Sequence, residues 1–443
     1  MKRIKVFIFN TIILMFTGII LRILTIYFNI YISNKIGTEM LGVFQLIMSV
    51  YLFGITLANF GINLSSTRVV AENLALNNIN GTKKVAKYCL YFSLISGICA
   101  SIIFYVFRNF ILTNCLHSKV SEEVIYLLCL ALPLISMSNA INGYFAGIRK
   151  VYKNSIAQFF EQISKIIVTA FFLNLFLPKG INYACISLII GDLVSEIFSF
   201  IFIYILYLFE IKKDYSKKST YIISDKNETY SKEILRISLP VAITSYIRSG
   251  LSTLKQLIIP SSLEKSGSSC ANALSTYGII NGMSLPIIMF PDIFIKSFSN
   301  LLIPEFSRYF AKKDFKRAKQ ITLLLLFLTG VISLFITAFL FIFSTPLGLK
   351  LYNNPYSGYY IKLLAPLAFF IYVDTVVDSI LRGLDAQVGV MIVNIFDLII
   401  SSTFIFFFVP KLGVNGYIIS IYISEIFNFS CSIYQLYKLM HNA

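Results

Sequence analysis

The sequence contains no tryptophan and few charged residues. Only 13% of its 443 residues are Asp, Glu, Lys or Arg, against roughly 25% in soluble domains. Hydrophobic residues make up 57% of the chain. This composition excludes a soluble globular domain and predicts an integral membrane protein. The 27 tyrosines then supply most of the aromatic belt at the membrane surface, a position that tryptophan usually shares.

The sequence also lacks the motifs that mark catalytic sites. It contains no HExxH, no GxSxG and no Walker loop, so we predict neither catalytic residues nor an ATPase domain on this chain, and we predict that it is not an enzyme. The two histidines, His117 and His441, lie far apart in polar segments, and none of the seven cysteines forms a CxxC pair. No metal site and no cofactor are therefore predicted.

Positive charge is in excess, with a formal net charge of +17. In a soluble protein this excess would indicate nucleic-acid binding. Here the Lys and Arg residues cluster in short links between apolar segments, as the positive-inside rule describes, so no nucleic-acid partner is predicted. If the chain starts in the cytoplasm, most of the basic links fall on the cytoplasmic side. This pattern predicts a multi-pass protein of the cytoplasmic membrane with both termini in the cytoplasm.

Long apolar runs divide the chain into twelve predicted spans, because a membrane-spanning helix needs about 20 apolar residues. These spans are 6–32, 40–63, 86–107, 123–148, 152–176, 181–209, 234–261, 274–303, 319–343, 358–382, 388–409 and 413–437. The stretch 211–233 between the sixth and seventh spans is polar and basic. It predicts a cytoplasmic linker between two six-helix lobes, 1–210 and 234–443.

The two predicted lobes resemble each other in sequence. When Gly180-Ile-Asn182 is aligned with Gly413-Val-Asn415, Asp192 falls on Glu425. An even number of helices in each half gives both halves the same direction across the membrane, so they are predicted to be related by a pseudo-two-fold axis along the membrane normal. Repeated halves of this kind predict an all-α transporter that works by alternating access.

Four of the cations inside the predicted spans are candidate site residues: Arg22, Arg248, Lys255 and Lys296. Because charge at membrane depth costs a few kcal/mol, it usually faces a partner or an aqueous cavity. Cations at successive depths suit an anionic head group such as a phosphate or pyrophosphate. The alternative is structural, since Lys296 has Asp292 one turn away and Lys255 can extend towards the membrane surface.

Five of the acids inside the predicted spans are also candidate site residues: Asp192, Glu196, Asp292, Asp397 and Glu425. They predict either Na⁺ or H⁺ sites that couple transport to a gradient, or counter-ions for the cations. Glu161 and Lys165 are one helical turn apart and are expected to pair, and the same spacing relates Asp378 to Arg382.

Several short motifs lie along the chain: Gly37-Thr-Glu-Met-Leu-Gly42, Phe60-Gly61-Ile62, Gly143-Tyr-Phe-Ala-Gly147, Tyr277-Gly278 and Pro304-Glu305. These motifs resemble those of the stage V sporulation protein B group. That group belongs to the polysaccharide-exporter branch of the multidrug/oligosaccharidyl-lipid/polysaccharide flippase superfamily. The resemblance covers nearly the whole chain. It implies a MATE-like, lipid II flippase-like fold, with two six-helix lobes around a central cavity.

The resemblance further implies a flippase that moves a lipid-linked oligosaccharide or peptidoglycan precursor across the bacterial cytoplasmic membrane, in cell-wall or spore-cortex synthesis. Its expected partners are a lipid-linked sugar pyrophosphate, membrane lipid and wall-synthesis enzymes. Related flippases use cavity arginines on the first helix and early in the second lobe, and Arg22 and Arg248 lie in comparable places. Typical members have fourteen spans, whereas this sequence predicts twelve.

Two alternatives stay open on the sequence. One is a Na⁺- or H⁺-coupled multidrug efflux antiporter of the same superfamily, which typically has twelve spans. The other is a non-transporting membrane scaffold for wall-synthesis enzymes. The scaffold predicts that the cations inside the spans can be neutralised without effect.

Overall fold

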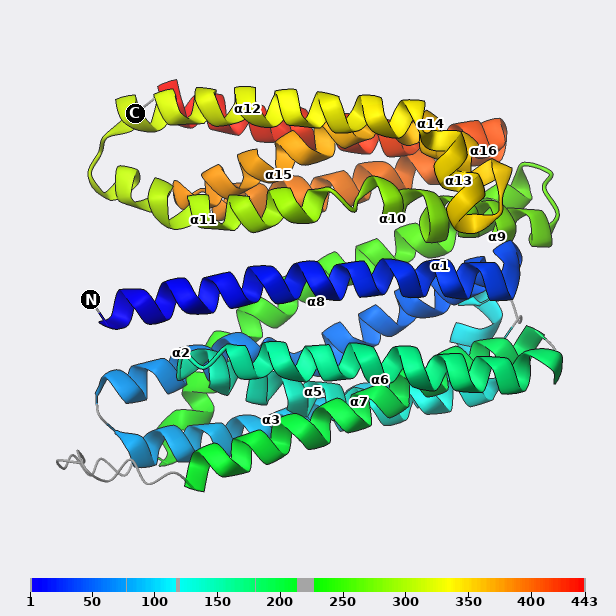
Figure 1. The fold of residues 1–443 in the computed structure, drawn as a ribbon. Helices are drawn as coiled ribbons and strands as arrows, with labels where there is room; N and C mark the ends of the chain where they lie inside the picture. Colours follow the sequence, from blue (N-terminus) through cyan, green and yellow to red (C-terminus); the bar gives the residue numbers. More distant parts are fainter. Residues whose placement is uncertain (1, 77, 117–119, 180, 213–226, 442–443) are drawn as a thin grey trace. The chain divides into compact units, whose positions relative to one another are not determined.

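The computed structural model describes the whole chain except residues 1, 77, 117–119, 180, 213–226 and 442–443 (Figure 1). The described part is built of helices and contains no strand, which confirms the predicted all-α class. His117 and most of the predicted linker lie outside the described residues. The main helices are α1 (Lys2–Asn59), α2 (Ile62–Ala75), α3 (Ile79–Val106), α5 (Glu122–Gly147), α6 (Tyr152–Phe176), α7 (Ile181–Lys212), α8 (Asn227–Lys265), α11 (Asp292–Ala311), α12 (Phe315–Ile342), α15 (Leu367–Gly383) and α16 (Gln387–His441).

Shorter elements connect these helices. They are α4 (Arg108–Phe110), the π-helical turn Ile111–Cys115, the 3₁₀ turn Leu177–Lys179, α9 (Cys270–Gly278), the π-helical turn Ile279–Ser284, α10 (Leu285–Ile288), α13 (Ser344–Tyr352) and α14 (Pro355–Leu364).

Contacts divide the chain into two compact units. The first comprises Met1–Thr25 and Leu46–Gly250, and the second comprises Ile26–Gln45 and Leu251–Ala443. The lobes expected from the sequence separate at 211–233 instead. The difference arises because α1 and α8 each contribute residues to both units. The division into six-helix lobes related by a membrane-normal axis stays a prediction.

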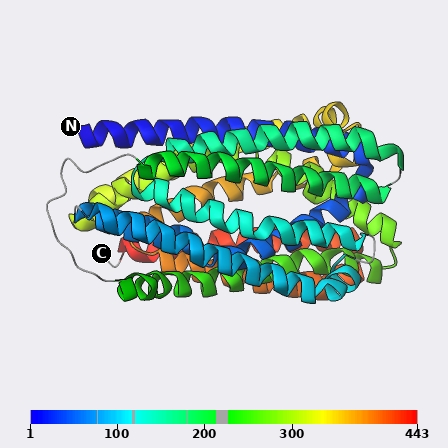
Figure 2. The same ribbon diagram turned by 90° about the horizontal axis from the view of Figure 1, so that it is seen from below.

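In the first unit, close backbone contact joins α5 to α2. A Cβ atom added to Gly143 would lie 2.5 Å from the carbonyl oxygen of Asn63, and one on Gly147 would lie 2.9 Å from that of Thr67. The Thr67 hydroxyl donates a hydrogen bond to the Gly143 carbonyl oxygen, at 3.1 Å. Two glycines four residues apart therefore let the helices touch, as their spacing predicts. In the same unit α6 and α7 pack along each other (Figures 1 and 2).

In the second unit, the 26–45 part of α1 packs on α9. A Cβ on Gly42 would overlap the carbonyl oxygen of Leu274, and one on Gly278 would overlap that of Thr38. The Thr38 and Ser275 hydroxyl oxygens are 2.6 Å apart and share a hydrogen bond. This backbone contact explains why residues 26–45 group with the second unit.

Two helices are broken at glycines in conformations that favour this residue. α1 has 58 residues and would be about 87 Å long if straight, nearly three times the roughly 30 Å hydrocarbon core. It is interrupted at Gly37, with φ 77° and ψ 174°. The 55-residue α16 is interrupted at Gly413, with φ 58° and ψ −135°. Side chains are disfavoured at such positive φ angles, and glycine is not.

The segment predicted as a single span at 274–303 is also interrupted. The α9–α10 segment, Cys270–Ile288, and α11 are bent by 52° relative to each other. Pro291 immediately precedes α11, where its missing N–H group removes no helical hydrogen bond but ends the preceding helix. A second bend, of 53°, separates α14 from α15.

Seven of the described helices are long and apolar enough to cross a membrane, or up to nine if each bent pair forms one span. The chain is therefore a multi-pass membrane protein. The predicted count of twelve is not confirmed. α1 and α16 account for part of the difference, because each covers two predicted spans that meet at a glycine break. α8, which carries Arg248 and Lys255, is not among the helices that are long and apolar enough to cross a membrane by this measure.

Candidate functional site

Two of the four predicted cations, Arg22 and Arg248, belong to the first unit. Arg22 lies on α1, and its buried Nε atom has no hydrogen-bond partner among the described residues. Arg248 lies on α8 with an exposed side chain. Neither arginine takes part in any ion pair found within the described part of the chain. A guanidinium group that has no carboxylate partner among the described residues is available to an anion.

The other two cations, Lys255 and Lys296, belong to the second unit and have acidic neighbours. Lys255 on α8 interacts electrostatically with Asp397 and Glu425 of α16. The Lys296 ammonium lies 2.6 Å from an oxygen of Asp292, one turn earlier on α11. The geometry favours a counter-ion role for Lys296 over contact with a substrate.

The acids of the first unit form a cluster on α6 and α7, which we call the first acidic cluster: Glu161, Asp192 and Glu196, with Lys165. The Lys165 Nζ atom lies 2.5 Å from Asp192 Oδ1 across the two helices. Lys165 also interacts electrostatically with Glu161 and Glu196. The Ser199 hydroxyl donates a hydrogen bond to Glu161, at 3.0 Å. Three carboxyl groups thus interact with one ammonium group, so the cluster contains more acids than lysines.

The acids of the second unit form a second acidic cluster: Asp292, Asp374, Asp397 and Glu425. The Thr375 hydroxyl donates to Asp292 at 2.8 Å, and the Ser424 hydroxyl donates to Asp397 at 2.6 Å. Asp374, Asp397 and Asp292 all interact electrostatically with Glu425. Each predicted acid of this unit is therefore hydrogen-bonded to a neighbouring helix or close to other charges.

Asp374 on α15 was not among the predicted site residues, although it belongs to the second cluster. Asn428 of α16 donates a hydrogen bond to Asp374 Oδ2, at 2.9 Å. The remaining oxygens of this pair, Asp374 Oδ1 and Asn428 Oδ1, are buried and have no partner among the described residues. Hard cations such as Na⁺ bind oxygen ligands of this type. The sequence signal that could have found the pair is a carboxyl and an amide inside two neighbouring spans.

Asp378, one turn after Asp374, is held differently. An Asp378 oxygen lies 3.6 Å from Arg382 Nη2, and the Ser432 hydroxyl donates to Asp378 at 3.4 Å. The expected pairing of Asp378 with Arg382 within one helix is confirmed. Within the described ranges, no group of three or more His, Cys, Asp or Glu residues is placed to hold a metal ion.

Comparison with known proteins gives these groups a context. The profile of a family described as polysaccharide biosynthesis protein matches residues 7–310, more than half of the chain. The MatE profile matches residues 266–407. Stage V sporulation protein B of Bacillus subtilis (strain 168) is 24% identical, over 93% of this chain and 80% of that protein. Sporulation protein YkvU of the same organism is 21% identical, over 77% and 74%.

Solved transporters share the fold. An inward-facing multidrug resistance MATE family transporter of the MOP superfamily superposes with a TM-score of 0.71 at 17% identity, over 95% of both chains. A MOP superfamily transporter from Pyrococcus furiosus Vc1, described as having a binding pocket of reverse polarity, gives a TM-score of 0.64 at 17% identity, over 97% of this chain and 95% of that one. The chain therefore has the MATE transporter fold and belongs to the polysaccharide biosynthesis protein family.

Proposed function

We propose that this protein is a flippase that moves a lipid-linked oligosaccharide or peptidoglycan precursor across the cytoplasmic membrane by alternating access. The observation that carries the proposal is the state of Arg22 on α1 and Arg248 on α8. Both are guanidinium groups of a polysaccharide biosynthesis family member, and neither is paired with a described carboxylate. The similarity to stage V sporulation protein B supports a role in cell-wall or spore-cortex synthesis.

Arg22 and Arg248 contact the pyrophosphate of the substrate in this proposal. Guanidinium groups suit the task because their planar N–H groups match phosphate oxygens in pairs and stay charged at every physiological pH. The buried Nε of Arg22 then gains the hydrogen bond that it lacks without substrate. Lys255 and Lys296 act as counter-ions for Asp397, Glu425 and Asp292.

The acidic clusters supply the coupling to an ion gradient. The open oxygens of Asp374 and Asn428 bind the coupling cation in the second unit. In the first unit Glu161, Asp192 and Glu196 share one lysine, and the cluster takes up a proton or cation to balance its charge. The chain carries out no covalent chemistry in this scheme. Both termini lie in the cytoplasm in this proposal. The wall-synthesis enzymes that make the substrate act on the same side of the membrane.

The test neutralises each arginine in turn. A hydrogen bond to a charged group contributes about 1.5–3 kcal/mol, so R22Q or R248Q should each lower transport about 10- to 150-fold. In proteoliposomes, the measurement is the fraction of a lipid-linked sugar pyrophosphate that becomes accessible to an outside reagent. In cells, depletion followed by expression of either variant should leave the precursor on the cytoplasmic leaflet.

The matched control is R68Q. Arg68 is also an arginine of the first unit, but its side chain is 64% exposed and pairs with Glu72 one turn away on α2. R68Q should transport at the rate of the unaltered protein. If both R22Q and R248Q transport normally while they insert and fold, the pyrophosphate assignment fails. Drug efflux driven by Na⁺ or H⁺, without movement of the lipid-linked sugar, would instead support the multidrug antiporter.

A further inference from the structure

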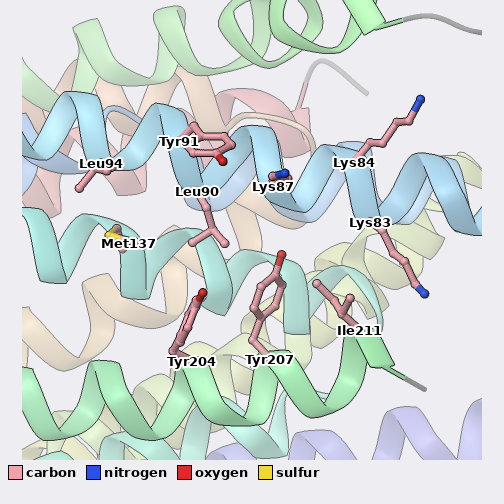
Figure 3. Close-up of a pocket in the computed structure, with 10 residues that line it drawn as sticks. All are labelled: Lys83, Lys84, Lys87, Leu90, Tyr91, Leu94, Met137, Tyr204, Tyr207 and Ile211. Atoms are coloured by element: carbon pink, nitrogen blue, oxygen red, sulfur yellow. The ribbon is translucent and has the colours of Figure 1, made fainter. Parts of the chain in front are cut away.

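A pocket of about 450 Å³ opens in the first unit between α3, α5 and α7. It is separate from the arginines and acidic clusters described above. The residues that line it are Lys83, Lys84, Lys87, Leu90, Tyr91, Leu94, Met137, Tyr204, Tyr207 and Ile211 (Figure 3). No acid is among them. The pocket therefore combines positive charge with an apolar wall.

Charge and hydrophobicity are separated along the pocket. Figure 3 shows Lys83 and Ile211 towards one end and Leu94 and Met137 towards the other. Lys87 lies between these ends, with its Nζ atom 5.7 Å from the centre of the Tyr91 ring. A pocket with cations at one end and aliphatic side chains at the other matches an amphiphile with an anionic head and a hydrocarbon tail.

Two of the lysines in the pocket, Lys83 and Lys87, have no carboxylate partner among the described residues. Glu210, the residue before Ile211, is fully buried and is held by two other lysines, Lys150 and Lys153. Neither Lys83 nor Lys87 belongs to an ion pair found within the described ranges. The ammonium groups of Lys83 and Lys87 thus remain to bind an anion in the pocket.

We propose that the pocket binds a single anionic phospholipid from the surrounding bilayer. Its phosphate lies against Lys83 and Lys87, and an acyl chain follows Leu90 and Leu94 towards Met137. Basic pockets between membrane helices recognise anionic head groups in this way, and each lysine near the surface contributes about 1 kcal/mol. In the predicted orientation this is the cytoplasmic leaflet. The site holds a resident lipid and does not depend on which substrate the protein transports.

The absence of tryptophan makes the site measurable. In the L94W variant of the full chain, the single indole lines the pocket, and its fluorescence is quenched by a bromine-labelled lipid that enters. The protein is reconstituted in bilayers that contain brominated phosphatidylglycerol or brominated phosphatidylcholine at equal fractions. We expect stronger quenching by phosphatidylglycerol. L328W, on an exposed leucine of α12, is the control and should be quenched equally by both lipids.

The lysines are tested in the L94W background. K83Q/K87Q should lower the preference for phosphatidylglycerol about fivefold for each lysine removed. The matched control K312Q/K316Q also removes two lysines four residues apart; both are exposed and lie at or near the start of α12. It should leave the preference unchanged. Equal quenching of L94W by the two lipids, absence of quenching, or an equal loss of preference in the two double variants would each overturn the proposal.

Discussion

The ion pair between Lys165 and Asp192 offers the sharpest test of the first acidic cluster. Its two atoms are 2.5 Å apart, with side chains that are 25% and 6% exposed. K165M removes the only ammonium group of the cluster and leaves Glu161, Asp192 and Glu196 facing one another. D192N removes one of the three carboxylates, and the double variant K165M/D192N removes both partners.

Removal of one partner from a buried ion pair costs about 3–5 kcal/mol, because the other charge stays buried without compensation. We therefore expect K165M to lower the stability of the first unit by this amount. For a unit of this size, about 2–4 °C in melting temperature corresponds to each kcal/mol, so the shift should be about 6–20 °C. The double variant should recover most of the loss, since replacing both partners is often nearly neutral.

Buried thiols report the unfolding of the unit. Cys89 and Cys185 are 0% and 1% exposed, so a thiol-reactive fluorescent dye labels them only when the first unit opens on heating. The exposed pair Arg68–Glu72 is the control. Such a pair contributes less than about 1 kcal/mol, so R68Q should change the melting temperature much less than K165M does. A double variant as unstable as K165M, or a K165M variant as stable as the parent, would refute the proposed dependence of the cluster on its lysine.

Two further predictions concern the second unit. Gly278→Leu should abolish the folded protein, because a Cβ atom at this position overlaps the backbone of α1. Gly330 is the control, since the nearest atom to a Cβ there is 4.0 Å away. Equal yields of monodisperse protein for G278L and G330L would contradict this packing. D374N should remove the Na⁺ or H⁺ dependence of transport, because the open oxygens of Asp374 and Asn428 then lose their charge. D385N, at an exposed aspartate just after the same helix, should leave the ion dependence unaltered, and the assignment fails if D374N also leaves it so.

The fold class was predictable because the physics of the bilayer permits few solutions. Long apolar runs must form helices, since only these satisfy the backbone within one segment. The sequence could not show that residues 26–45 pack in the second unit with α9. That contact depends on Gly42 and Gly278, 236 positions apart in the chain and without side chains of their own. The helix breaks at Gly37 and Gly413 were likewise not predicted as such, although the ends of predicted spans fell near both.

The candidate site was predictable where helical periodicity decides the neighbours. Residues one helical turn apart are neighbours regardless of what packs around the helix. The pairs Asp292–Lys296 and Asp378–Arg382 therefore follow from spacing alone. The same rule placed Lys165 beside Glu161 but missed its ion pair with Asp192 on the next helix. It also missed Asp374 and Asn428, whose contact joins two helices at one depth.

Composition and charge pattern by themselves determined that this is a helical multi-pass membrane protein with cations and acids inside its spans, and its motifs indicated the family. These conclusions depend on local properties: hydrophobicity, helical spacing and the cost of buried charge. Tertiary structure alone decided which charges are neutralised and which remain open. Arg22 keeps a buried nitrogen without a partner among the described residues, while Lys165 is held by Asp192 of the next helix. The rotation and contact of neighbouring helices settle that difference, and no single stretch of sequence encodes it.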